Sequence, residues 1–124
     1  MIRVVDTSAW IEILVGSPLA PSLVKQLPHR DDCVVPTLVQ LELTKWLNRQ
    51  ENAEASTRVL SFTMRCRVVP LNTGVALRAA ELCKEHGLST ADGIIYATAI
   101  DQDADLLTCD AHFRGLEGVN YVPK

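Results

Sequence analysis

The sequence predicts an α/β protein in which helices cover both faces of a parallel sheet. Short apolar runs of strand length alternate with longer helical segments along the chain. These runs lack the polar alternation of a sheet with one solvated face, so buried strands are expected. The 124 residues, 48% hydrophobic and 22% charged, are sufficient for one core and show no sign of disorder. We therefore expect a single domain over residues 1–124.

The N-terminal segment predicts one strand followed by two short helices. The run from Ile2 to Val5 is too short and too apolar for an amphipathic helix, so a buried strand is expected. Thr7 and Ser8 can cap a following helix, which Gly16 ends. A second short helix is expected at about residues 20–27.

The middle of the chain predicts a second strand followed by two helices. The run from Cys33 to Val35 is apolar and of strand length. Pro36 suits the first turn of a long helix reaching about Gln50, because that turn does not need the missing N–H. Asn52 can cap another helix that runs to about Met64.

The C-terminal half predicts three further strands and two helices. A strand at Val68 and Val69 ends at Pro70, which cannot donate a ladder hydrogen bond. Gly87 is the residue type favoured just after a helix. The other elements expected here are a helix from an Asn72 cap to Gly87, a helix from Ser89 to about Gln102, and strands at Leu106–Cys109 and Val119–Val122.

Four acidic residues stand inside or directly after the apolar runs. Asp6 and Asp110 each follow a predicted buried strand, whereas Glu42 and Asp92 lie within apolar helical segments. Ligands of open parallel sheets collect beyond the carboxyl ends of the strands, so Asp6 and Asp110 are expected to face one crevice. The competing interpretation makes each of these two residues a helix cap or turn residue.

Glu42 and Asp92 each have a structural alternative as well. On a helical wheel Glu42 lies about 60° from the centre of the apolar arc, which favours an inward-facing carboxylate over a surface pair with Lys45. Asp92 has the spacing of a capping box with Ser89, yet the helix one turn further on is apolar. Capping and metal binding are compatible at Asp92.

Convergence of the four carboxylates would require a cation. Two unit charges about 4 Å apart repel by about 4 kcal/mol at an effective dielectric constant of about 20. Several such pairs rival the stability of a whole domain. Carboxylate oxygens suit Mg²⁺ or Mn²⁺ far better than zinc, and such an ion can activate water to hydrolyse a phosphodiester.

The histidines and cysteines indicate no further site. His86 at a helix end and His29 in a polar turn are assigned no role, and His112 is interpreted as a surface or capping residue, although it could touch a phosphate. The cysteines form no C-x-x-C pair and are expected to be reduced, small apolar side chains. They are Cys33, Cys66, Cys83 and Cys109.

Charge and hydropathy limit the classes of partner. The net charge of -3 does not by itself indicate a nucleic-acid partner. Six arginines could still form a local basic surface: Arg49, Arg58, Arg65, Arg67, Arg78 and Arg114. The N-terminus lacks a signal-peptide pattern and no segment has the length of a membrane span, so a cytoplasmic protein without membrane contact is expected.

Four segments of the chain resemble the PIN-domain nucleases, and among them the VapC-type toxins of bacterial toxin–antitoxin modules. They occur in the family's order, span essentially the whole chain, and are more specific as a set than singly. The matching segments are Val4-Val5-Asp6-Thr7-Ser8, Leu41-Glu42-Leu43, Leu88-Ser89-Thr90-Ala91-Asp92-Gly93-Ile94-Ile95-Tyr96-Ala97 and Leu107-Thr108-Cys109-Asp110-Ala111-His112-Phe113. One departure concerns His112, because some relatives carry another acid at that position.

The resemblance implies a three-layer α/β/α sandwich with a mainly parallel sheet and an endoribonuclease that depends on Mg²⁺ or Mn²⁺. It also implies an RNA substrate, a cognate antitoxin, and a homodimer or a toxin–antitoxin hetero-oligomer. The residues implied as catalytic and metal-binding are Asp6, Glu42, Asp92 and Asp110. The groups implied to support them or to bind substrate are Thr7, Ser8 and Thr108.

Two other functions remain open from the sequence alone. A phosphate-accepting receiver domain has a similar length, a parallel sheet and an acidic Mg²⁺ pocket. It would show an acidic pair after the first strand, where this chain has Thr7 and Ser8 after Asp6, and a Lys after the last strand, where this chain has only Lys124. A non-catalytic PIN-like binding module is the second alternative.

Overall fold

Five parallel strands form one sheet, in the order β3-β2-β1-β4-β5, in the computed structural model, which describes residues 1–124. The strands are β1 (Arg3–Val5), β2 (Cys33–Pro36), β3 (Arg67–Val69), β4 (Asp105–Thr108) and β5 (Val119–Tyr121). The helices are α1 (Thr7–Leu14), α2 (Ala20–Lys25), α3 (Thr37–Arg49), α4 (Ala53–Met64), α5 (Thr73–His86) and α6 (Thr90–Asp101). Two short 3-10 turns, η1 (Arg30–Asp32) and η2 (Ala111–Phe113), complete the chain.

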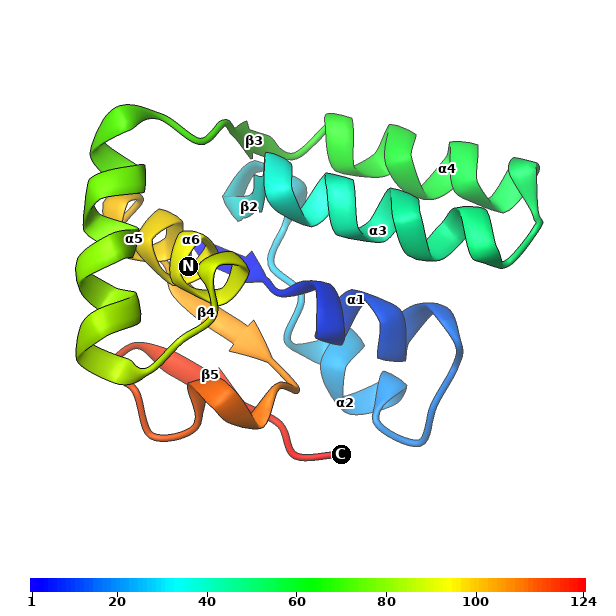
Figure 1. Cartoon of the computed structure of the whole chain (residues 1–124). Helices are drawn as coiled ribbons and strands as arrows, with labels where there is room; N and C mark the ends of the chain where they lie inside the picture. Colours follow the sequence, from blue (N-terminus) through cyan, green and yellow to red (C-terminus); the bar gives the residue numbers. More distant parts are fainter.

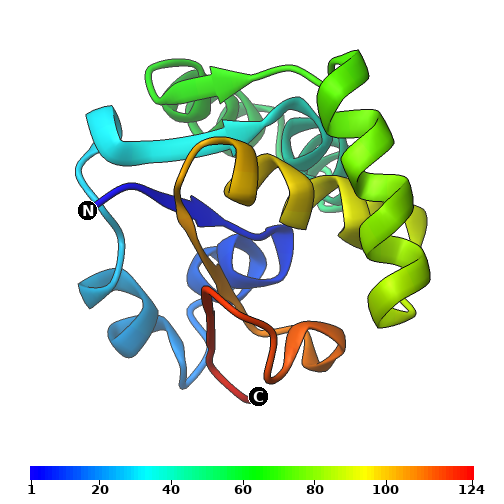
Figure 2. The same cartoon turned by 90° about the vertical axis from the view of Figure 1, so that its left-hand side faces the viewer.

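Helices cover both faces of this sheet, which confirms the predicted three-layer sandwich. Helices α1 to α4 lie on one side and α5 and α6 on the other, as two perpendicular views show (Figures 1 and 2). The chain first moves outward from β1 to β3 and then crosses back to β4. The strand order therefore reverses between β1 and β4, where ligands of open α/β sheets bind.

The central strands supply the middle of the core, as their apolar sequences predicted. Four of their residues, Val4, Val5, Leu106 and Leu107, have no exposed surface. Gly93 on α6 allows α5 to approach closely, because a Cβ atom there would overlap the Cys83 sulfur and lie 3.1 Å from the Ala79 carbonyl oxygen. No helix of the protein is both long enough and apolar enough to cross a membrane.

Most predicted helix ends are confirmed by hydrogen bonds. The Asn52, Asn72 and Ser89 side chains accept from backbone N–H groups in the first turns of α4, α5 and α6. Gly87 ends α5 in the left-handed conformation, with φ of 67°.

Two predicted helix starts are wrong. Helix α1 already begins at Thr7, and Asp6 rather than Thr7 or Ser8 takes the capping position, without a side-chain capping bond. Pro36 lies at the end of β2, one residue before α3, because the strand continues through it.

A buried ion pair at the amino end of the central strands escaped prediction. Arg3 lies within the apolar run yet is only 7% exposed. Its Nε and Nη2 atoms donate to the two carboxylate oxygens of Asp105 at 2.7 and 2.8 Å, and Nη1 donates to the Gln26 carbonyl oxygen at 2.7 Å. The parallel register pairs Arg3 directly with Asp105, 102 residues later in the chain.

Candidate metal centre at the carboxyl edge of the sheet

The carboxyl ends of β1 and β4 bring Asp6 and Asp110 to the same edge of the sheet. Asp6 directly follows β1 and Asp110 lies two residues after β4. The Asp6 amide donates to the Leu107 carbonyl oxygen at 2.9 Å, which extends the β1–β4 ladder by one residue. Adjacency of these two strands, visible at the centre of Figure 1, places both acids at the reversal of strand order.

Two hydroxyl groups fix the Asp6 carboxylate. Its Oδ2 atom accepts from Ser8 Oγ at 2.7 Å and from Thr108 Oγ1 at 2.8 Å. The same hydroxyls accept from the backbone beyond β4, Ser8 from the Cys109 amide at 3.0 Å and Thr108 from the Asp110 amide at 3.0 Å. Asp6 is 4% exposed, so these bonds replace part of its lost hydration.

Asp92 joins this edge from the first turn of α6. Its side chain is 15% exposed and that of Asp110 is 29% exposed. The ligand atoms of Asp92, Asp110 and His112 lie within 4.8 Å of one another. His112 Nδ1 is 3.0 Å from Asp110 Oδ1 and 3.7 Å from Asp92 Oδ2. His112 is exposed, as predicted for a surface residue, but its ring lies against both carboxylates.

Ser89 caps α6 through the Asp92 amide, and the capping interpretation of Asp110 holds, alongside this clustering. The Asp92 amide donates to the Ser89 hydroxyl at 3.2 Å. The Asp110 side chain accepts from the His112 amide at 2.8 Å and begins the η2 turn. The bond at Asp92 uses its amide and not its carboxylate, and the bond at Asp110 leaves carboxylate lone pairs free, so a local structural role does not prevent cation binding.

The carboxylates at this edge are not neutralised by Lys or Arg. His112 is the only basic residue that forms an ion pair with Asp92 or Asp110, and none pairs with Asp6. Burial, followed by the charges of Asp110 and Asp6, raises the pKa of Asp92 to about 6, against the hydrogen bond from Ser89 and the charge of His112. Burial also raises the pKa of Asp6, with the Ser8 and Thr108 hydrogen bonds acting in the opposite direction.

Glu42 faces inward from α3, as the helical wheel predicted, but is not a member of the group of closely spaced ligand atoms. It is half-buried and its Oε1 accepts from Thr7 Oγ1 at 2.7 Å. No ion pair joins it to Lys45, so the competing surface interpretation is wrong. Its carboxylate is not part of the group formed by Asp92, Asp110 and His112, and neither is that of Asp6. The bond to Thr7, which follows Asp6 in the chain, keeps Glu42 on the border of the site.

The donor set at the edge fits a hard divalent cation. Carboxylate oxygens predominate, and their pKa values show that the protein alone does not stabilise the charged forms fully. A hollow of about 440 Å³ borders the cluster and leaves space for a ligand. It is lined by Ser8, Cys109, Asp110, Ala111, Tyr121 and Lys124.

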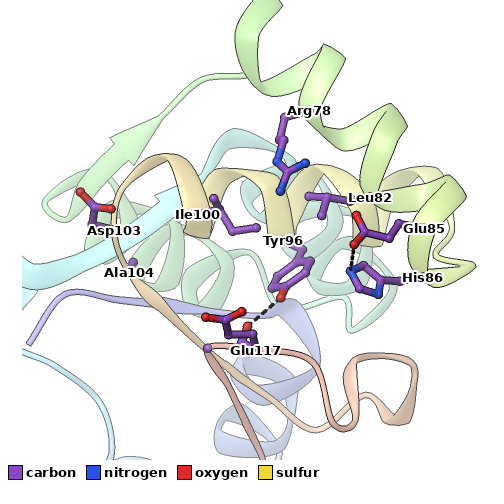
Figure 3. Close-up of a pocket in the computed structure, with 10 residues that line it drawn as sticks. Arg78, Leu82, Glu85, His86, Tyr96, Ile100, Asp103, Ala104 and Glu117 are labelled. Atoms are coloured by element: carbon purple, nitrogen blue, oxygen red, sulfur yellow. Dashed lines mark hydrogen bonds and ion pairs between the residues drawn. The ribbon is translucent and has the colours of Figure 1, made fainter.

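A different hollow, of about 410 Å³, lies between α5, α6 and the segment that leads into β5 (Figure 3). There the Tyr96 hydroxyl donates to the Glu117 carbonyl oxygen at 2.6 Å, and His86 packs edge-on against the Tyr96 ring. Arg78 lines this hollow, while Arg58 and Arg65 together line another on α4, so these three arginines lie at two separate places. None of the predicted site residues lines the hollow of Figure 3.

Comparison with known proteins adds a family match and similar solved structures. The family model described as PIN domain matches residues 3–119. The chain is 33% identical over 92 residues to Ribonuclease VapC22 of Mycobacterium tuberculosis, covering 71% of this chain and 70% of that protein.

Two of the solved structures that share this fold are a toxin-antitoxin complex from Klebsiella pneumoniae and the VapC20 toxin of Mycobacterium tuberculosis. The first has a TM-score of 0.83 at 21% identity and covers 95% of both chains. The second, described as a Sarcin-Ricin loop cleaving toxin, has a TM-score of 0.75 at 18% identity and covers 98% of both chains. At these identities the likeness concerns the fold.

Proposed function

This chain belongs to the PIN-domain family, and on that premise we propose that it is a metal-dependent endoribonuclease and the toxin of a toxin–antitoxin module. The observation that carries the proposal is the meeting of Asp6, Asp92 and Asp110 at one edge of the sheet without a Lys or Arg partner. The chain is 33% identical to a protein named as a ribonuclease, which supports RNA as the substrate.

Asp92 and Asp110 are the residues proposed to hold the cation, with Asp6 beside them. When bound, Mg²⁺ or Mn²⁺ would neutralise these charges, lower the pKa of a bound water and stabilise the leaving oxygen of the phosphodiester. The Ser8 and Thr108 hydroxyls orient the Asp6 carboxylate, and they tie its position to the backbone on either side of Asp110. Such bonds to a ligand carboxylate fix its geometry before the ion binds.

Glu42 is proposed as the outer acid of the site. The hydrogen bond from Thr7 holds one of its oxygens, and the other remains free to accept a proton or a hydrogen bond from water or from RNA. This role fits its place on the border, outside the group of ligand atoms. Asp6 and Glu42 thus depend on different hydroxyl groups for their orientation.

The partner proposed for this site is an antitoxin that supplies a positive charge. An Arg side chain can engage carboxylates bidentately and would offset the unmatched charge of Asp6, Asp92 and Asp110. Apolar surface for an amphipathic segment is present on α1, where Leu14 is 37% exposed. Trp10 on the same helix is 5% exposed and belongs to the core, so it is not part of this surface.

The proposal extends to the domain organisation, the assembly and the location of the protein. Residues 1–124 form a single nuclease domain, the protein assembles as a homodimer or with its antitoxin, and it resides in the cytoplasm. The last proposal is supported by four free thiols, which suit a reducing compartment. A non-catalytic binding module would keep the fold but lack RNA cleavage.

RNA cleavage by the purified protein tests the proposed activity. We expect cleavage of RNA with Mg²⁺ or Mn²⁺ and none in excess EDTA. Replacing Asp6 or Asp110 by Asn should lower the rate by at least about 100-fold, because each substitution removes a charge that faces the ion. Asp101→Asn, which alters an exposed acid at the far end of α6, is the matched control and should retain activity. Full activity in EDTA would contradict the proposal, and so would full activity of both site variants.

A further inference from the structure

His112 is the one nitrogen donor within the acidic cluster. The sequence had favoured a surface or capping role, yet Nδ1 lies 3.0 Å from Asp110 Oδ1 and 3.7 Å from Asp92 Oδ2. The backbone amide of His112 donates to the same Asp110 oxygen at 2.8 Å, so the turn itself holds the ring close to that carboxylate. The geometry points to His112 as a third ligand of the cation, together with Asp92 and Asp110.

The distances from His112 Nδ1 to the two carboxylates are close to those between ligands of one ion. Two atoms bound at right angles to an octahedral ion, with bonds of about 2.1 Å, lie about 3.0 Å apart, and two atoms on opposite sides lie about 4.2 Å apart. The 3.0 Å between His112 Nδ1 and Asp110 Oδ1 matches the first arrangement. The 3.7 Å to Asp92 falls between the two values. Ligation therefore needs only side-chain adjustment.

An imidazole ligand changes which ion the site prefers. Mg²⁺ takes oxygen ligands and loses water reluctantly, so a nitrogen donor adds little to its binding. First-row transition metal ions bind mixed nitrogen and oxygen sites more tightly, rising from Mn²⁺ along the series. His112 therefore biases the site toward Mn²⁺ or a similar transition metal ion and away from Mg²⁺. This inference rests on the proposed function, because it concerns the same site.

Spectroscopy of bound Mn²⁺ tests the ligand directly. Electron spin-echo measurements on the wild-type protein with Mn²⁺ should show coupling to a nitrogen nucleus. His112→Asn should abolish this coupling, because an amide coordinates through oxygen. His29→Asn, at an exposed histidine of another turn, is the matched control and should retain it.

Calorimetric titration of both ions supplies the second readout. His112→Asn should weaken Mn²⁺ binding by about tenfold or more while changing Mg²⁺ binding by less than about twofold. His112→Asp replaces the nitrogen with an oxygen donor and should lower the ratio of Mn²⁺ to Mg²⁺ affinity. Circular dichroism of the metal-free variants checks that each retains the fold.

The results separate this inference from the proposed activity. Absence of nitrogen coupling in the wild-type protein, or its persistence in His112→Asn, overturns the ligand assignment, and RNA cleavage by the same wild-type sample would leave the proposed function intact. Equal loss of Mn²⁺ and Mg²⁺ binding in His112→Asn also overturns it, since the ring would then act only as an ion-pair partner. Nitrogen coupling without RNA cleavage by any ion would support the ligand and contradict the nuclease.

Discussion

The two ends of the β1–β4 pair differ in whether a cationic side chain of the protein pairs with the carboxylates. At the amino end, Asp105 receives two hydrogen bonds from the guanidinium of Arg3, and this pairing raises the pKa of Arg3 despite its burial. At the carboxyl end, Asp6 and Asp110 meet Asp92 without a Lys or Arg partner, and the pKa of Asp92 rises to about 6.

The difference shows which charges serve the fold and which serve the proposed chemistry. Both groups of carboxylates flank the same pair of strands, which are held in a single register. A carboxylate that the chain itself neutralises contributes to stability and has little capacity left for a ligand. Carboxylates without a cation lower the free energy of unfolding of the metal-free protein. Binding of an ion at the carboxyl end would restore that stability.

The largest effect that separates the two ends is expected from removing Arg3. Arg3→Met should lower the free energy of unfolding by about 3 to 4 kcal/mol, because it leaves Asp105 partly buried and unpaired. Asp6→Asn should leave the metal-free stability unchanged or raise it, because it removes one of several repelling charges. Urea denaturation without metal measures both.

A double-mutant cycle with Asp105→Asn isolates the pair at the amino end. The loss from Arg3→Met should shrink when Asp105 is already neutral, since no unpaired charge is then left behind. The comparison fails if Asp6→Asn destabilises as strongly as Arg3→Met.

A smaller effect is expected from the pH dependence of Asp92. Its pKa is about 6 in the folded protein, against an ordinary value of 3.8, so the folded state binds more protons between these values. The stability that Asp92 contributes is therefore present below about pH 4 and is lost as the pH rises toward 6. Metal-free Asp92→Asn should exceed the wild type in stability by an amount that grows over this window to no more than about 2 kcal/mol, allowing for partial solvent exposure.

Denaturation curves of the two proteins across this pH range test the sign. Because groups outside the acidic cluster titrate equally in both proteins, the difference between them reports Asp92 and the charges coupled to it. Saturating Mn²⁺ should reverse the difference, since the ion stabilises only the protein that keeps the carboxylate. If the difference in unfolding free energy between the two proteins did not change with pH, the charged form of Asp92 would not be destabilised by its surroundings.

The smallest effect is expected in the reactivity of two buried thiols. Cys109 follows β4 and its amide donates to Ser8 in the acidic cluster, whereas Cys33 begins β2 at the other end of the sheet. Saturating Mn²⁺ should slow alkylation of Cys109 by about a few-fold and leave Cys33 unaffected, because exposing Cys109 requires opening the site. Burial raises the pKa of the Cys33 thiol to about 12, so its alkylation should be slow throughout. Mass spectrometry of alkylated protein measures both rates, and equal slowing would indicate global opening.

Local sequence patterns were sufficient to predict most of the fold and part of the candidate site. Apolar runs predict the strands, and the positions of Asp6 and Asp110 just after two of those runs predict that both lie at the carboxyl edge of the sheet. The helical wheel placed Glu42 on an inward face, but could not show that it bonds to Thr7 on another helix and lies outside the group of closely spaced ligand atoms.

Contacts across the sheet account for what the sequence could not predict. Pairing of Arg3 with Asp105 depends on the register between strands 102 residues apart. The approach of His112 to Asp92 depends on how η2 and α6 meet in space, and no periodic pattern encodes that. Resemblance to a family did not help either, because His112 stands where some relatives carry an acid.

The hydroxyl bond between Thr108 and Asp6 also sets an order of events during synthesis. Asp6 is synthesised 102 residues before Thr108, so β1 lacks its β4 neighbour until that later segment has been made. Pairing of residues so far apart in the chain comes late in folding as well. A nascent chain therefore has no assembled acidic cluster until synthesis has passed Asp110, and the proposed nuclease activity cannot begin earlier.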